Sequence, residues 1–249
     1  MSGHSKWHSI KHKKAALDAK RGKIFTKVIR ELVVAARMGG PDPPNNPRLR
    51  MAIAAARDAN MPKDTIERNI KKGAGEVAGA TYEDVTYEGY GPGGVAILVE
   101  CSTDNKNRTA AAIRHCFNKH SGSLGTTGCV SYLFKKRGVI RVKAEGKSED
   151  DAMEAALDAG AEDFSNDGET FAITTTQGSL MAVREALEAK GFEVESSSAQ
   201  NIADTSVRVQ GKEAESLLKL LNALEDDEDT TNVSANFEVD DEVLAKLPA

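Results

Sequence analysis

Apolar residues in the first third of the chain recur at steps of three and four positions, which predicts a run of amphipathic helices. In the first helix Phe25, Leu32 and Ala36 fall on one face. The proline-rich segment 41–47 separates this helix from the next, and Pro62 stands near the start of a third. The three helices are expected over residues 20–38, 48–59 and 62–72, with Gly73 just past the end of the third. Joined by short loops, they predict a small helical domain.

From residue 81 onward the pattern changes to short β-branched runs that alternate with helices. Strands are expected over residues 81–87, 95–100, 129–134, 139–142, 171–175, 206–209 and 233–237. Helices are expected over residues 107–120, 148–160, 179–190 and 213–224. Three strand–helix pairs recur about every 33 residues, a spacing also found in solenoid repeats, but the alternation suits split βαβ modules better.

These elements predict an α+β fold in which an N-terminal three-helix domain precedes two ferredoxin-like α+β modules. The block 136–204 is self-contained, so we expect it to be inserted in the other module. The predicted domains are residues 1–80, which hold a basic arm and the helices, residues 81–135 completed by 205–249, and the inserted module 136–204.

Charge is distributed unevenly along the chain. Residues 1–30 hold nine Lys or Arg and one acid, although the formal net charge of the whole chain is −5. Residues 101–143 form a second cationic block, with nine bases and one acid, whereas residues 144–249 hold seven bases and 26 acids. A cationic arm ahead of an acidic body is typical of a polyanion binder, for which nucleic acid is the commonest partner. The alternative is a tail that only increases solubility. Trp7 and the interleaved His and Ser are not typical of such a tail.

The candidate nucleic-acid contacts come from these two cationic blocks. Winding residues 20–38 at 100° per residue places the cations of that helix opposite its apolar face, where they would form an exposed cationic face. Trp7 could stack on a base or anchor the arm to the helical domain. The candidates are Lys6, Trp7, Lys11, Lys13, Lys14, Lys20, Arg21, Lys23, Lys27, Arg30, Arg108, Arg114 and Lys119.

Two glycine-rich segments resemble nucleotide-binding loops. Residues 89–94 satisfy the G-x-G-x-x-G spacing, but a proline interrupts them and a strand follows, so we expect a turn between strands. Residues 122–128 lack the Gly-Lys-Ser/Thr ending of a P-loop. Their backbone N–H groups could meet a phosphodiester, or the segment could simply connect a helix to a strand.

The remaining side chains predict neither catalysis nor a cofactor. His4, His8 and His12 could share one helical face, but no Cys or carboxylate accompanies them, so phosphate contact is favoured over zinc. No serine stands in a strand–turn–helix elbow, and we expect no enzyme, no metal site and no cofactor. Scattered cysteines without a Cys-x-x-Cys pair fit a reducing cytoplasm. Neither a membrane span nor a secretory signal is expected, and the chain is expected to act as a monomer.

Several long motifs make the chain resemble the YebC family, most strongly before about residue 135. They are Gly3-His-Ser-Lys-Trp7, Ile10-Lys-His-Lys-Lys-Ala15, Asp18-Ala-Lys-Arg-Gly-Lys-Ile-Phe-Thr-Lys27, Asn60-Met-Pro-Lys-Asp-Thr-Ile-Glu-Arg68, Tyr87-Glu-Gly-Tyr-Gly-Pro-Gly-Gly94, Thr103-Asp-Asn-Lys-Asn-Arg-Thr109 and Gly122-Ser-Leu-Gly125. The resemblance implies three domains around a concave surface and a cytoplasmic protein without known catalytic residues. It also implies a DNA-binding transcriptional regulator, although relatives include a mitochondrial translational activator of a cytochrome oxidase subunit and the family is linked to ribosomes stalled on proline-rich stretches. Cys129 stands where the family usually has Ser, which affects no expected function.

Two functions therefore remain. The chain could bind duplex DNA as a regulator of transcription, although no helix-turn-helix reading helix is evident, so base specificity would be weak. Alternatively, it could bind ribosomal RNA, with the ribosome as partner, and act in translation, because Lys, His and Trp beside Gly-rich loops also suit irregular RNA.

Overall fold

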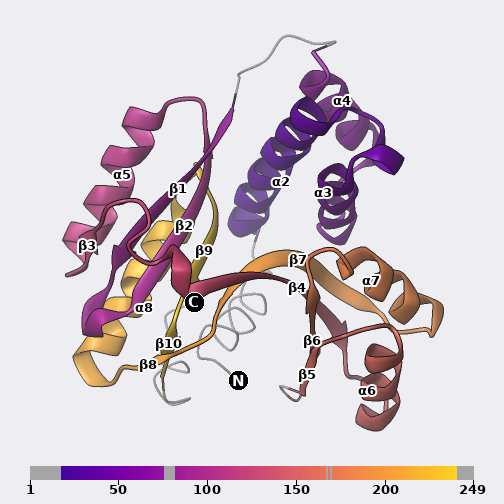
Figure 1. Ribbon diagram of the computed structural model, residues 1–249. Helices are drawn as coiled ribbons and strands as arrows, with labels where there is room; N and C mark the ends of the chain where they lie inside the picture. The colour runs from indigo at the N-terminus through magenta and orange to yellow at the C-terminus, as the bar shows by residue number, and fades with distance from the viewer. Residues whose placement is uncertain (1–17, 76–81, 167, 169, 240–249) are drawn as a thin grey trace.

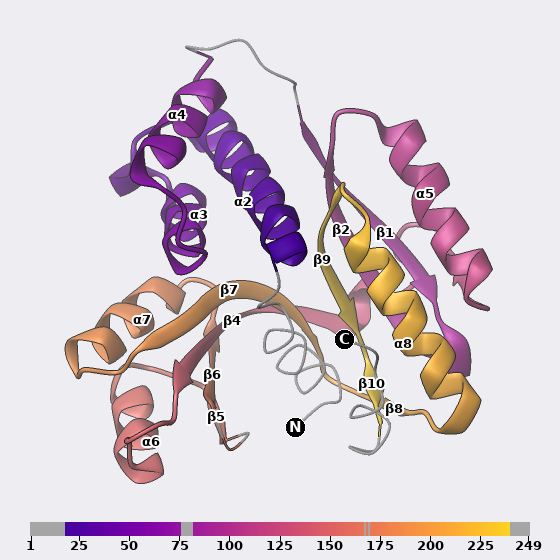
Figure 2. The same cartoon turned by 180° about the vertical axis from the view of Figure 1, so that it is seen from behind.

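The computed structural model describes residues 18–75, 82–166, 168 and 170–239, which fold into a helical domain and two α+β modules (Figures 1 and 2). The predicted fold class is confirmed. The helical domain consists of α2 (Asp18–Gly39), α3 (Pro47–Asp58) and α4 (Lys63–Gly73), with the 3₁₀ turn η1 (Pro43–Asn45) between α2 and α3.

Two close contacts hold the helical domain together around a core of Leu and Ala side chains. The buried Asn46 amide accepts a hydrogen bond from the Leu49 N–H at 3.0 Å and donates to the Ala35 carbonyl at 2.7 Å. It therefore caps α3 while satisfying a carbonyl of α2. At the end of α4, a Cβ on Gly73 would lie 2.4 Å from the Val33 carbonyl oxygen, so the approach of α4 to α2 requires glycine.

The first module is a four-stranded sheet of order β3-β1-β2-β9, with α5 and α8 packed on one face. Its elements are β1 (Glu83–Tyr90), η2 (Pro92–Gly94), β2 (Ala96–Thr103), α5 (Lys106–Lys119), β3 (Ser123–Leu124), α8 (Gly211–Asp226) and β9 (Thr230–Ala235). A parallel pair, β8 (Val207–Arg208) and β10 (Phe237–Glu238), lies beside it. Phe117 of α5 and the leucines of α8 fill the core against β2.

The second module is inserted between β3 and β8 and has the β-α-β-β-α-β order of a ferredoxin-like fold. Its sheet order is β5-β6-β4-β7, all antiparallel. The elements are η3 (Ser131–Leu133), which leads into the module, then β4 (Phe134–Lys143), α6 (Glu149–Asp158), β5 (Asp163–Asn166), β6 (Thr170–Thr176), α7 (Leu180–Ala189) and β7 (Val194–Ala203). The chain leaves the first module along β4 and returns along β7, so these two long paired strands join the modules (Figure 1).

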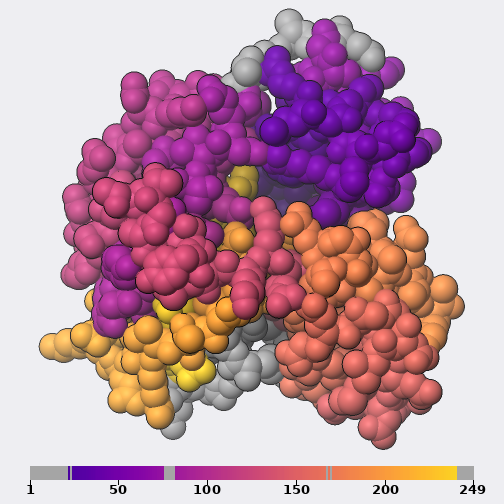
Figure 3. Space-filling view, in the orientation of Figure 1, coloured from indigo at the N-terminus to yellow at the C-terminus, as the bar shows by residue number. Residues whose placement is uncertain are grey.

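Polar contacts also join the helical domain and the two modules. The three parts meet around a recess near the centre of the face shown in Figure 3. Arg184 of α7 pairs with Asp58 at the end of α3 at 2.9 Å, and both side chains are nearly buried. Arg30 of α2 contacts the first module through an ion pair with Asp229 at 3.0 Å. The predicted strand over residues 129–134 is wrong, because residues 131–133 form η3 and β4 begins at Phe134.

Candidate nucleic-acid interface

The predicted contacts in residues 1–23 divide into those outside the described residues and those at the start of α2. Lys6, Trp7, Lys11, Lys13 and Lys14 lie outside the described residues, as do His4, His8 and His12. The backbone of Lys20, Arg21 and Lys23 belongs to the first turns of α2, and their side chains are not described. A role for these residues in nucleic-acid binding stays a prediction.

Lys27 and Arg30 lie against the first module, which corrects the prediction of a continuous exposed cationic face on α2. Lys27 Nζ donates to the Glu225 carbonyl at 2.6 Å. Arg30 Nη1 donates to the carbonyls of Ser102 and Glu228 at 2.8 and 2.7 Å. The side chain of Arg30 is only 11% exposed. Amphipathic periodicity identified the polar side of the helix correctly, but part of that side packs on another module instead of meeting solvent.

Asp229, which precedes β9, is the buried carboxylate on which this contact converges. It accepts hydrogen bonds from Arg30 at 3.0 Å, from Arg108 at 2.8 Å and from the Thr109 hydroxyl at 2.7 Å. Burial by itself would raise the pKa of Asp229, but hydrogen bonds from Arg108 and Thr109 and the charge of Arg30 outweigh it, so the pKa lies below the ordinary 3.8. Arg108 also pairs with Asp104 at 2.9 Å. Arg30 therefore joins the helical domain to the first module, and Arg108 helps to hold the carboxylate that Arg30 binds, roles that sequence reasoning missed.

Arg114 and Lys119 lie on the solvent side of α5, and both are exposed. Within the described part of the chain neither side chain makes an ion pair. Their neighbours are also basic: burial lowers the pKa of His120, and the charges of Lys119, Lys219 and His115 lower it further. Arg114 and Lys119 thus place on this side of α5 two positive charges that make no ion pair with a described residue, and they can contact a phosphate.

Several N–H groups of the loop after α5 are already used within the chain. Those of Gly122 and Gly125 donate to the carbonyls of Phe117 and Glu88 at 2.8 Å each, and others hold an internal anion. The buried carboxylate of Glu88 accepts hydrogen bonds from the N–H groups of Gly128, Val130 and Ser131 at 2.7, 2.8 and 2.7 Å. Burial by itself would raise the pKa of Glu88, but these three donors outweigh it and leave the pKa below 4.5. Of the two interpretations of residues 122–128, a structural connection is therefore favoured.

Replacing this carboxylate should loosen the loop. We expect Glu88→Ala to reduce the free energy of unfolding by about 2–4 kcal/mol, because three N–H groups lose their acceptor. Denaturant unfolding measures the loss, and faster hydrogen exchange at Val130 and Ser131 locates it. The control is Glu162→Ala, which removes an exposed ion pair with Arg137 and should cost less than about 1 kcal/mol. Equal losses in both variants would contradict this role of Glu88.

The glycine-rich segment 89–94 forms a turn between strands, as predicted. Residues 92–94 form η2 between the antiparallel strands β1 and β2, with positive φ at Gly93 and Gly94. No helix opens from this turn to receive a pyrophosphate, so a dinucleotide site has no basis here.

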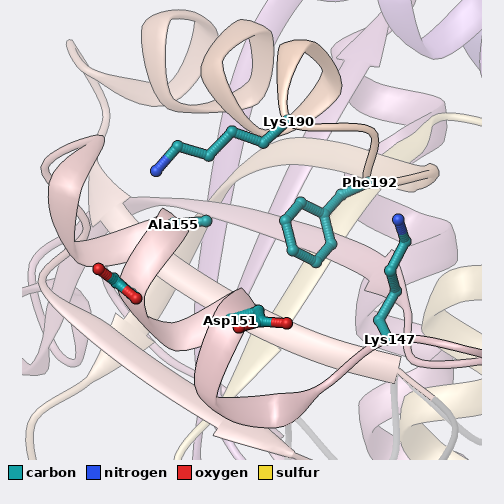
Figure 4. A pocket seen from close by; sticks show the side chains of 6 residues that line it. Lys147, Asp151, Ala155, Lys190 and Phe192 are labelled. Atoms are coloured by element: carbon teal, nitrogen blue, oxygen red, sulfur yellow. The ribbon is translucent and has the colours of Figure 1, made fainter.

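A pocket of the second module is lined by residues of α6 and of the segment that follows α7 (Figure 4). Lys147 Nζ lies 5.2 Å from the centre of the Phe192 ring, and Lys190 pairs with Asp158 at 3.1 Å. Asp151 and Glu154 also line it. Because its cations are already partnered and its lining carries both signs of charge, we assign no ligand to it.

The described residues contain no group of three or more His, Cys, Asp or Glu arranged to hold a metal. Cys101, Cys116 and Cys129 are free thiols, and burial raises the pKa of Cys101 to about 12, which makes it a poor nucleophile. Among the same residues, no helix has the length and apolar character that crossing a bilayer requires.

Comparison with known proteins identifies the family to which the chain belongs. Residues 5–76 match the TACO1/YebC protein N-terminal domain, and residues 82–237 match the TACO1/YebC second and third domain. A protein of Acidithiobacillus ferrooxidans named "probable transcriptional regulatory protein" is 56% identical over 249 residues, which cover 100% of this chain and 99% of the relative. A protein of the same description from Desulforapulum autotrophicum is 54% identical over 98% of both chains. The crystal structure of a conserved hypothetical protein from Aquifex aeolicus matches with a TM-score of 0.85 and 49% identity, covering 91% of this chain and 93% of that one.

Proposed function

The chain belongs to the TACO1/YebC family, and from this premise we propose that it is a non-enzymatic, nucleic-acid-binding regulator of gene expression that binds DNA and acts on transcription. The observation that carries the proposal is the concentration of positive charge. Residues 1–30 hold nine Lys or Arg against one acid in a chain of net charge −5. A local cationic segment attracts phosphate even when the whole molecule is acidic.

The contacts divide by position. The arm contributes Lys6, Trp7, Lys11, Lys13 and Lys14, and the first turns of α2 contribute Lys20, Arg21 and Lys23. Arg114 and Lys119 of α5 form a second contact. Lys27 and Arg30 already have partners within the chain and position α2 beside the first module, while Arg108 is paired with Asp229 inside that module. The protein acts in the cytoplasm as a monomer, and its free thiols agree with a reducing compartment.

The α5 contact can be tested without disturbing the fold. Arg114→Gln with Lys119→Gln should weaken binding uniformly across sequences and make the salt dependence shallower by about one unit of slope per contact. Lys147→Gln with Lys190→Gln removes the same charge from the second module and serves as control. Affinity measured by fluorescence anisotropy over a salt series distinguishes them. Indistinguishable slopes for the two double variants would remove α5 from the interface.

Ribosomal RNA is the second candidate target, with a role in translation that includes relief of stalling on proline-rich stretches. Two observations favour it. The exposed side of α4 carries Asp64 and Glu67 among its cations, and Glu67 pairs with Lys63 at 3.7 Å, which suits a base-reading helix poorly. In addition, an exposed tyrosine after β3 suits unpaired bases, as argued below.

Co-sedimentation from lysate decides between the two targets. Transcriptional action predicts that the protein is released from large complexes by DNase and not by RNase. Release by RNase alone, together with co-migration with ribosomes, would overturn the DNA proposal in favour of translation. A protein that sediments with neither nucleic acid at physiological salt would contradict both.

A further inference from the structure

Tyr132, in η3 between the two modules, is the most exposed large hydrophobic side chain of the described residues, at 73%. Tyr90, at the end of β1, is 38% exposed. Its hydroxyl donates to the Cys129 carbonyl at 2.9 Å. Cys129 precedes Tyr132 by three residues, so this hydrogen bond brings the Tyr90 hydroxyl to the segment that carries Tyr132. The segment that carries Tyr132 lies at the surface of the first module in Figure 3.

The backbone that carries Tyr132 is held firmly in place. Glu88 receives the N–H groups of the two residues just before it, Val130 and Ser131. Val130 is fully buried against Ala96 and Leu98 of β2, on the sheet face opposite α5 and α8, and Leu133 packs beside it. An exposed ring on a rigid backbone loses little conformational freedom when it binds a flat partner.

Two lysines stand three and four positions after Tyr132, and as successive residues of a strand they face opposite sides. Lys135 and Lys136 open β4 and have side chains 60% and 48% exposed. Their partners, Asp204 at 2.7 Å and Glu100 at 3.3 Å, form surface ion pairs, which contribute little and are exchanged for phosphate at small cost. An isolated exposed apolar side chain is ordinary on a protein surface. A fixed, exposed aromatic ring followed within four residues by exchangeable cations has the composition of sites that bind single-stranded nucleic acid.

We propose that Tyr132, on the segment to which Tyr90 is hydrogen-bonded, stacks on an unpaired base of a single-stranded nucleic-acid segment, of which a phosphate contacts Lys135 or Lys136 of the following strand. This inference rests on the proposed function and narrows it. In a continuous duplex the flat faces of the bases are covered by their neighbours, so a ring can stack only where a base is unpaired. The protein therefore binds a junction, loop or displaced strand of its target in preference to an unbroken helix.

The test compares binding of an oligonucleotide that contains one 2-aminopurine, in single-stranded form and as a blunt duplex. Tyr132→Ala should weaken single-strand binding roughly 5- to 150-fold and leave duplex binding unchanged. Tyr132→Phe keeps the ring and should retain affinity within about twofold, with quenching of 2-aminopurine on binding. Leu157→Ala, an exposed truncation on α6, is the matched control. RNA and DNA versions of the probe show which sugar the site accepts.

The outcomes separate the inference from the function on which it rests. Equal loss for single strand and duplex in Tyr132→Ala, or no loss at all, overturns the stacking site, while the function stands if substitution of the N-terminal lysines still abolishes binding. Loss of affinity in Tyr132→Phe equal to that in Tyr132→Ala also overturns it, because the ring would then not be the contact. A native chain that binds neither probe overturns both.

Discussion

Asp229→Asn is expected to lower the free energy of unfolding by about 3–5 kcal/mol, because it removes one partner of a buried charge cluster. The asparagine keeps the shape of the side chain but leaves Arg30, 11% exposed, and Arg108 without their shared carboxylate. Asparagine has one acceptor oxygen, so its NH2 group must face either Arg30 or Thr109, which then loses its acceptor. Unfolding by urea, followed by circular dichroism, measures the loss.

The control is Asp204→Asn, which neutralises a carboxylate 56% exposed that pairs with Lys135. An exposed pair of this kind should contribute about 0–1 kcal/mol. A loss below about 1 kcal/mol in Asp229→Asn would contradict the role of Asp229 in joining α2 to the first module.

The acid limb of the stability curve gives a second measure of the same carboxylate. The pKa of Asp229 is lowered in the folded chain, so its stabilisation is complete above the ordinary 3.8 and disappears as the pH falls through the lowered value. Asp229→Asn should therefore lose less stability than the native chain over that acidic range.

Replacing five lysines of the N-terminal segment by glutamine is expected to abolish nucleic-acid binding at physiological salt, with a loss of at least about 100-fold. The physical reason is that each phosphate contact releases counterions, so the contributions accumulate over the contacts. The substituted residues are Lys11, Lys13, Lys14, Lys20 and Lys23. Affinity for DNA and RNA probes, measured by anisotropy, gives the result.

A charge-matched variant controls for the change in net charge. It replaces five exposed or half-exposed lysines elsewhere by glutamine: Lys71, Lys72, Lys147, Lys190 and Lys212. This variant should bind within a few-fold of the native chain, because long-range attraction is screened beyond about 10 Å. Retained affinity in the N-terminal variant would remove that segment from the interface.

The helices could be predicted because each carries its own local signals. The proline-rich segment and Pro62 separate α2, α3 and α4, and the observed starts and ends lie within about two residues of the predictions. The order of strands and helices was enough for the fold class as well, since split βαβ modules follow from that order.

Strands without an apolar alternation could not be predicted. β7 (Val194–Ala203) reads Ser-Ser-Ser-Ala-Gln-Asn in its middle, and it is a strand because β4 supplies its hydrogen-bond partners. β5 is only four residues long and pairs with β6. Residues 129–134 have β-branched and aromatic residues, yet Glu88 binds their N–H groups and turns the chain instead.

The same limit applies to the candidate site. The sequence identified Arg30 as a cation on the polar side of its helix, but not its partner Asp229, almost 200 positions away in an acidic run typical of a solvated surface. Glu88 and Tyr132 were likewise missed, because only the fold reveals that one is buried and the other exposed. Long-range contacts have no local signal, so only structure separates the cations that join domains from those that remain exposed.

The salt dependence of binding tests the central claim most directly. If the N-terminal segment binds phosphates through five or more contacts, the logarithm of the association constant should fall linearly with the logarithm of salt concentration, with a slope of about −4 or steeper for duplex DNA. The five-lysine variant should show a slope shallower by about four units. A slope near zero for the native chain, or equal slopes for the two proteins, would contradict nucleic-acid binding by this segment.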